Sequence, residues 1–301
     1  MSTAFTPDAG ALPLAEPAST TSTVLPTRTS AGLGSTSEVP PVSGAAAADP
    51  WQPLRAHTQA RIGLRRAGDT LATTEVLALR ASHALARDAV CTALDTDALR
   101  TTLAGLGLGS PVHVRSAAGD RNRYLRRPDL GRTPADLTQL APAGADLALV
   151  VCDGLSATAV HDHAAGLCAA LVREFVPDYT FAPPVLATQA RVALGDHIGQ
   201  ALGARVVLVV IGERPGLSVA DSLGIYLTYQ PRPGRVDSER NCISNIHPPD
   251  GLGYTGGAVI ARDLVDQMIR TGRSGVSIKA RSAPTLPPGQ SPSITPTPEN
   301  S

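Results

Sequence analysis

The sequence contains few aromatic residues and carries no net charge. Three Phe, five Tyr and one Trp stand among 301 residues, which disfavours a platform on which nucleic-acid bases stack. The 26 basic residues are matched by 26 acidic ones, so we expect no bulk electrostatic attraction to nucleic acid or to an anionic membrane. Lys279 is the one lysine, and so uniform a preference for arginine is best explained by genome composition.

Cysteine is also scarce, and long apolar runs are missing. No two of the four cysteines are spaced as C-x-x-C, and no secretory signal precedes them, so we expect free thiols in a reducing cytosol. No apolar run reaches the length of a transmembrane helix. These absences predict a soluble cytoplasmic protein.

Several familiar site motifs are missing as well. The sequence has no G-x-G-x-x-G at a strand-to-helix turn, which disfavours a nicotinamide enzyme, and it has neither a P-loop nor a G-x-S-x-G elbow. His161 and His163 would point to different faces of a helix, and no carboxylate or cysteine stands at supporting spacing. We therefore predict no metal site.

Composition divides the chain into four segments. Residues 1–48 are rich in Ala, Pro, Ser and Thr and are expected to form a disordered extension, as is the Pro- and Ser-rich tail at 281–301. Residues 49–141 are predicted to form a smaller, mainly helical region with an arginine-rich loop. Residues 142–280 alternate strand and helix patterns and are predicted to form the main domain.

The predicted N-terminal region contains an amphipathic helix at 74–94, because its apolar residues recur near helical spacing. Arginines then cluster between residues 112 and 132. The stretch Tyr124–Arg132 is predicted to be a structured loop, because Pro128 and Gly131 interrupt it. Two interpretations stay open, a surface of exposed ion pairs, which is the commoner case, or a surface that binds a partner or an anion.

The main domain is predicted from buried strands followed by tight turns. The continuous apolar run at 206–211 is typical of a strand buried on both faces of a parallel sheet, and 145–152 is predicted to be a second buried strand. A short strand at 184–189, an edge strand at 224–229 and helices at 157–175, 191–202 and 257–270 complete the expected elements. The predicted fold class is α/β, with a Rossmann-like, doubly wound sheet.

Two strand ends carry residues suited to binding a ligand. Open α/β sheets bind ligands at the carboxyl ends of their strands. The run Gly212–Gly216 follows one such strand and sets Glu213 and Arg214 between glycines, although a plain turn with solvated charges is an alternative. Asp153 and Ser156 follow another strand, where they either cap the next helix or contact a ligand.

Six motifs occur together in the order typical of one family. They are Thr58–Gly68 (TQARIGLRRAG), Ser82–Val90 (SHALARDAV), Tyr124–Arg132 (YLRRPDLGR), Asp153–Ser156 (DGLS), Gly212–Gly216 (GERPG) and Cys242–His247 (CISNIH). In these motifs the sequence resembles the small (light) subunit of ethanolamine ammonia-lyase, an adenosylcobalamin-dependent enzyme. The resemblance covers about residues 52–279.

The resemblance implies a cobalamin held between this chain and a large subunit shaped as a (β/α)8 barrel. It implies cobalamin contacts at Val192, Glu213 and Cys242, with substrate binding and radical handling mainly on the barrel and no catalytic acid or base on this chain. The implied reaction converts ethanolamine to acetaldehyde and ammonia. Whether the assembly lies inside a bacterial microcompartment is left open.

Two other functions stay compatible with the residues alone. One is a stand-alone α/β enzyme that uses Cys242 or Asp153, although a neutral buried thiol is the commoner state of such a cysteine. The other is a non-catalytic docking subunit whose arginine-rich loop binds a protein. Activity without a partner or corrinoid would identify the first, and co-purification with a barrel subunit lacking cobalamin would identify the second.

Overall fold

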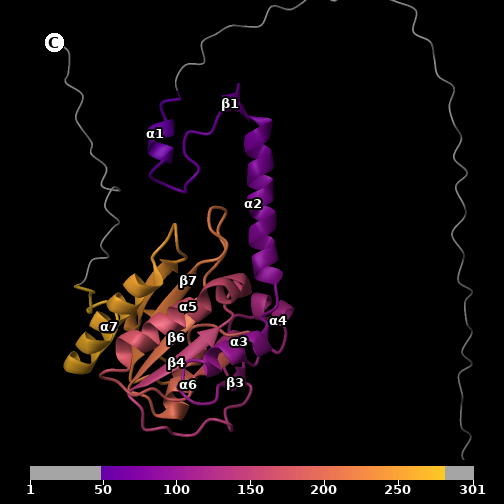
Figure 1. The fold of residues 1–301 in the computed structure, drawn as a ribbon. Coiled ribbons are helices and arrows are strands. Elements are labelled where there is room, and N and C mark those ends of the chain that lie inside the picture. Colours follow the sequence, from indigo (N-terminus) through magenta and orange to yellow (C-terminus); the bar gives the residue numbers. More distant parts are fainter. Residues whose placement is uncertain (1–48, 282–301) are drawn as a thin grey trace, which may run out of the picture. The chain divides into compact units, whose positions relative to one another are not determined.

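A six-stranded sheet forms the centre of the computed structural model, which describes residues 49–281 (Figure 1). Its strands lie in the order β3-β5-β4-β6-β7-β8. The bounds are β3 Val112–Arg115, β4 Leu147–Cys152, β5 Val185–Thr188, β6 Val206–Gly212, β7 Leu223–Tyr229 and β8 Asn241–Ile246. The predictions of disorder at 1–48 and 281–301 fall, apart from residue 281, outside the described residues.

The sheet is mixed. β3, β5, β4 and β6 pair in parallel, whereas β7 pairs antiparallel with both β6 and β8. Every residue of β4 and β6 is buried, as expected for central strands covered on both faces. The predictions of strands at these two positions are confirmed.

Helices cover both faces of this sheet. The helices are α1 Gln52–Arg55, α2 Thr73–Cys91, α3 Thr96–Ala104, α4 Arg121–Arg126, α5 Ala157–Phe175, α6 Leu194–Leu202 and α7 Tyr254–Thr271. Shorter elements are the hairpin β1 Arg66–Ala67 and β2 Thr70–Leu71 and the 3-10 turns η1 Leu130–Arg132 and η2 Asp237–Glu239. Helices α3, α5 and α7 bury their apolar sides in one core layer, and α6 buries its own in the layer on the opposite face.

The α6 face of the sheet is only partly covered. Helix α6 packs on β4 and β6. Further along the same face, Tyr226 on β7 is half-buried, and Cys242 and Ser244 on β8 are exposed. Because successive strand residues point to opposite faces, Ile243 points instead into the layer under α7. The surface of β7 and β8 beside α6 is therefore open to contact.

Two successive connections lead to opposite sides of β4 in the sheet. From β4 the chain passes through α5 to β5 on one side, and from β5 through α6 to β6 on the other side. The carboxyl ends of β4 and β6 thus diverge at a topological switch point, where open α/β sheets bind ligands.

The mixed α/β prediction is confirmed, and some of its details are wrong. Strand β7 lies between β6 and β8, so it is not an edge strand. Part of the predicted loop Tyr124–Arg132 is helical, because Asp120 caps α4 by accepting the N–H of Arg123 at 2.9 Å. Strand β3 was not predicted, and it joins residues 112–115 of the predicted N-terminal region to the sheet.

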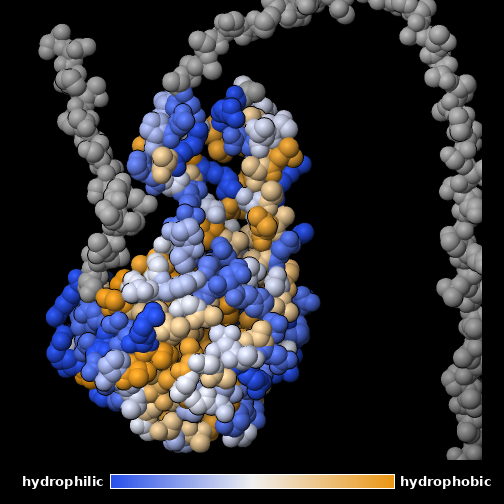
Figure 2. Space-filling model, in the orientation of Figure 1, coloured by the Kyte–Doolittle hydropathy of each residue, from blue (hydrophilic) through white to orange (hydrophobic). Residues whose placement is uncertain are grey.

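Helix α2 confirms the predicted helix but buries little of its apolar side. Ala89 is its one buried residue, whereas Leu77 and Leu85 are 58% and 64% exposed. Hydrophobic residues are visible along α2 in Figure 2. Among residues 49–281, no helix is both long and apolar enough to cross a membrane.

Two glycines allow the ends of β4 and β6 to approach each other. Gly154 has a φ of 57°, and a Cβ added to it would lie 2.1 Å from the carbonyl oxygen of Gly212. A Cβ added to Gly212 would lie 2.0 Å from the carbonyl oxygen of Ser156. The turn after β4 therefore lies directly against the end of β6.

We predict that Gly212→Ala lowers the free energy of unfolding by roughly 2–4 kcal/mol, because the backbone atoms it would contact cannot move without displacing a strand end. Denaturant unfolding measures this. The matched control is Gly253→Ala, where an added Cβ meets nothing within 4 Å and the expected cost is below about 1 kcal/mol. If both substitutions lowered the free energy of unfolding equally, the close approach of the ends of β4 and β6 would be contradicted.

Candidate functional site

A pocket of about 400 Å³ opens where β4 and β6 end. Its walls come from both strand ends, from α4, from the segment before α6 and from β7. They are Tyr124, Gly154, Leu155, Arg191, Val192, Ile211, Gly212, Glu213, Arg214 and Tyr226. Val192 and Glu213, which are 21 positions apart in the sequence, thus line one pocket at the switch point.

The Glu213 carboxylate is held through one oxygen. Its Oε2 accepts hydrogen bonds from the Ser222 hydroxyl at 2.7 Å and from the Asn245 N–H at 3.1 Å. Asn245 adopts a φ of 62°, a left-handed conformation that Asn tolerates better than most residues. Within the described residues Oε1 accepts no hydrogen bond. Glu213 therefore has a fixed orientation and one oxygen available to a donor on a ligand.

A buried carboxylate anchors the segment that leads to Val192. Asp153 is 2% exposed and accepts the N–H groups of Gln189 at 2.7 Å and Ala190 at 2.9 Å. Burial raises the pKa of Asp153, and the two N–H donors oppose that rise. The N–H of Arg191 donates to the carbonyl of Gly131 at 2.8 Å. Three consecutive backbone N–H groups before Val192 are therefore fixed.

Ser156 and Asp153 act within the fold. The Ser156 hydroxyl caps α5 by accepting the N–H of Ala159 at 3.1 Å, and it donates to the carbonyl of Ala220 at 2.8 Å. Both oxygens of Asp153 are occupied by backbone donors. The arrangement favours the structural interpretation for these two residues over ligand contact.

Tyr124 is fully buried between two arginines. Its hydroxyl donates to the carbonyl of Ala190 at 3.1 Å. The guanidinium carbons of Arg121 and Arg191 lie 4.8 Å and 4.4 Å from its ring centroid, within the range of cation–π contacts. The arginine-rich stretch therefore places part of its charge against the pocket. Elsewhere in that stretch, Arg127 and Asp129 form an exposed ion pair at 2.6 Å.

Cys242 lies beside the pocket and does not line it. It is the second residue of β8, directly opposite Tyr226 of β7. Although the residue is partly exposed, packing around the thiol raises its pKa, the nearby Glu213 carboxylate raises it further, and a hydrogen bond with Tyr226 opposes the rise. The thiol is therefore neutral near pH 7, which disfavours a nucleophilic role.

The three predicted contact residues share one face of the sheet. Val192 and Tyr226 pack against the core layer on the α6 side, and Cys242 pairs with Tyr226 across the strands. Burial raises the pKa of both Tyr226 and Cys242, and the nearby Glu213 carboxylate raises each pKa further. Val192, Glu213 and Cys242 thus border one continuous open surface.

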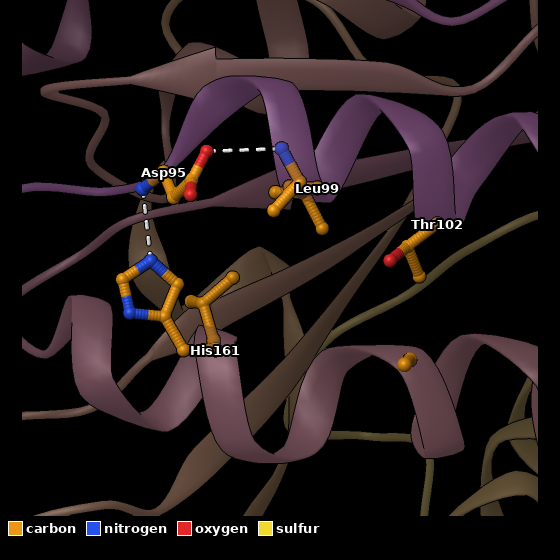
Figure 3. A pocket seen from close by; sticks show the side chains of 7 residues that line it. Asp95, Leu99, Thr102 and His161 are labelled. Atoms are coloured by element: carbon orange, nitrogen blue, oxygen red, sulfur yellow. Dashed lines mark hydrogen bonds between the residues drawn. The ribbon is translucent and has the colours of Figure 1, made fainter.

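A second pocket, of about 270 Å³, lies between α3 and α5 (Figure 3). Nε2 of His161 accepts the backbone N–H of Asp95 at 2.8 Å, and the Asp95 carboxylate caps α3. His163 points elsewhere, to the Tyr254 hydroxyl at 2.9 Å. Among residues 49–281, no three His, Cys, Asp or Glu side chains gather as a metal site would require.

Sequence patterns did not identify Tyr124, Arg191 or Tyr226 as pocket residues. The available signals were weak, since Arg191 precedes Val192 and Tyr124 lies in the arginine-rich stretch. Their convergence depends on the order of the strands, which no local pattern reveals.

Comparisons with known proteins identify one family. A model of the ethanolamine ammonia-lyase light chain matches residues 48–279. The ethanolamine ammonia-lyase small subunit of Rhodococcus erythropolis is 54% identical over 234 residues, which cover 78% of this chain and 91% of the relative. The small subunit of Ralstonia nicotianae is 48% identical over 252 residues, 80% of this chain and 93% of the relative. The small subunit of Xanthomonas campestris pv. campestris is 47% identical over 240 residues, which cover 77% of this chain and 88% of the relative.

We predict that Asp153→Asn lowers the free energy of unfolding by roughly 2–3 kcal/mol, because the amide nitrogen leaves one of two buried N–H groups without an acceptor. Denaturant unfolding measures the change. Asp250→Asn, at an exposed position, is the control and should change stability by less than about 0.5 kcal/mol. Unchanged stability of Asp153→Asn would contradict the anchoring role.

Proposed function

Because this chain belongs to the ethanolamine ammonia-lyase light-chain family, we propose that it is the small subunit of an adenosylcobalamin-dependent ethanolamine ammonia-lyase. The proposed assembly converts ethanolamine to acetaldehyde and ammonia in the cytoplasm. The observation that carries the proposal is the family match over residues 48–279, which spans all three residues bordering the open surface.

The residues present fit one side of a corrinoid. Pockets that enclose drug-sized ligands measure about 300–1,000 Å³, and a corrinoid is larger than such ligands. A pocket of about 400 Å³ therefore cannot enclose one, but together with the open face of β7 and β8 it can form one wall of a larger site. The remaining wall would come from the large subunit, a (β/α)8 barrel in our proposal.

The chain's own residues would orient the cofactor. A corrin ring carries acetamide and propionamide groups, and the available Oε1 of Glu213 is suited to accept an amide N–H. Val192 offers an apolar contact in the same pocket. Cys242 and Tyr226 form the adjoining surface of the sheet, with a neutral thiol that tolerates an apolar neighbour.

Adenosylcobalamin supplies radical chemistry through homolysis of its cobalt–carbon bond. This chain would hold the cofactor and exclude water from one side of it. We propose that substrate binding and catalytic acid–base groups belong to the partner.

We expect the isolated chain to release no ammonia from ethanolamine and to bind cobalamin poorly, because it supplies one wall of the site. The large subunit, this chain and adenosylcobalamin together should release ammonia. An ammonia assay with each component omitted in turn measures this. Robust ammonia release by the isolated chain would overturn the proposal.

We expect Glu213→Ala to weaken adenosylcobalamin binding to the two-subunit assembly by about 10-fold or more, since a hydrogen bond to a charged group contributes about 1.5–3 kcal/mol. Glu213→Gln, which keeps the shape of the side chain, should weaken adenosylcobalamin binding less than Glu213→Ala does. Glu174→Ala on α5, under the opposite face of the sheet, is the control. Unchanged cofactor affinity of Glu213→Ala in a titration would count against the site.

A further inference from the structure

The positive charge of Arg191 has no acidic partner in the described part of the chain. Its Nε is buried and has no hydrogen-bond partner. The one hydrogen bond that the Arg191 side chain donates runs from Nη2 to the carbonyl of Tyr124 at 3.5 Å, the outer limit of a hydrogen bond. Within residues 49–281 Arg191 forms no ion pair. A guanidinium has five N–H donors, so most of them are unused.

Arg121 is a comparable arginine with more acceptors, although its buried Nη2 also has no hydrogen-bond partner. It packs on the other face of the Tyr124 ring, and its Nε donates to the carbonyl of Val90 at 2.7 Å. Its Nη1 donates to the carbonyl of Gly154 at 2.8 Å and lies 3.7 Å from the Asp153 carboxylate. The protein supplies two carbonyl acceptors within 2.8 Å to Arg121, whereas the guanidinium of Arg191, at the wall of the pocket, has one acceptor at 3.5 Å.

Arg191 is nevertheless held in place. Its backbone N–H is bonded to Gly131, and its Cγ lies so close to Gly131 that an added Cβ there would stand 2.9 Å away. Its guanidinium stacks on the Tyr124 ring. A buried polar group without a partner destabilises a fold unless a ligand supplies one. A fixed guanidinium that lines a pocket and has no acceptor except one carbonyl at 3.5 Å is arranged for an anion.

We propose that Arg191 binds the phosphodiester of the cofactor's nucleotide loop. This inference rests on the proposed function. The amide groups of cobalamin are neutral, and its phosphodiester is the anionic group whose oxygens match the guanidinium fork. Arg214 at the rim adds a second positive charge to the same pocket. Arg191 thus distinguishes complete cobalamins from corrinoids that lack the nucleotide loop.

The test measures binding of two corrinoids to the assembly of this chain with its large subunit. Cyanocobalamin carries the phosphodiester, and cobinamide keeps the ring amides without it. Arg191→Met keeps a long side chain that can pack on the Tyr124 ring and removes the charge. We expect it to weaken cyanocobalamin binding about 10-fold or more and to change cobinamide binding by less than about 2-fold. Arg191→Lys should have an intermediate effect on cyanocobalamin and keeps the test usable if the Met variant does not fold.

Arg270→Met, at an exposed position near the end of α7, is the control and should leave both affinities unchanged. Equal weakening of both corrinoids would overturn the inference, because it would indicate a contact with ring amides or a packing effect. Unchanged cyanocobalamin binding would overturn it too. If the wild-type assembly bound neither corrinoid, the proposed function itself would fail, and the inference with it.

Discussion

The site depends on one buried interaction, the contact of the Asp153 carboxylate with the backbone of Gln189 and Ala190. It ties the end of β4 to the segment after β5, which places Arg191 and Val192 at the switch point. Arg121 extends the same network to the end of α2 through the carbonyl of Val90. A carboxylate that the sequence allowed as a ligand contact is instead the anchor from which the pocket is built.

The open surface beside this anchor follows from how α6 covers the sheet. Helix α6 packs on β4 and β6, and beyond them Tyr226 of β7 is half-buried and β8 exposes Cys242 and Ser244 on that face. Helix α6 thus leaves this part of the sheet available for contact with a partner. This geometry supports a cofactor shared between two chains.

The sequence allowed the central elements to be predicted, since β4, β6 and α5 have patterns dominated by burial. β3 and α4 were missed because a four-residue strand and a six-residue helix are too short for a period to show. The meeting of Val192 with Glu213 was implied by resemblance but had no local signal. Arg191 could not be recognised as a binding residue from the sequence, because the hydrogen-bond acceptors around a side chain are set by the fold and not by the residue itself.

The most direct test of the account is an experimental structure of this chain with its large subunit and bound cobalamin. The account predicts that the corrin ring lies on the surface bordered by Val192, Glu213 and Cys242, with the second subunit covering its other side. A ring located away from the ends of β4 and β6 would contradict it.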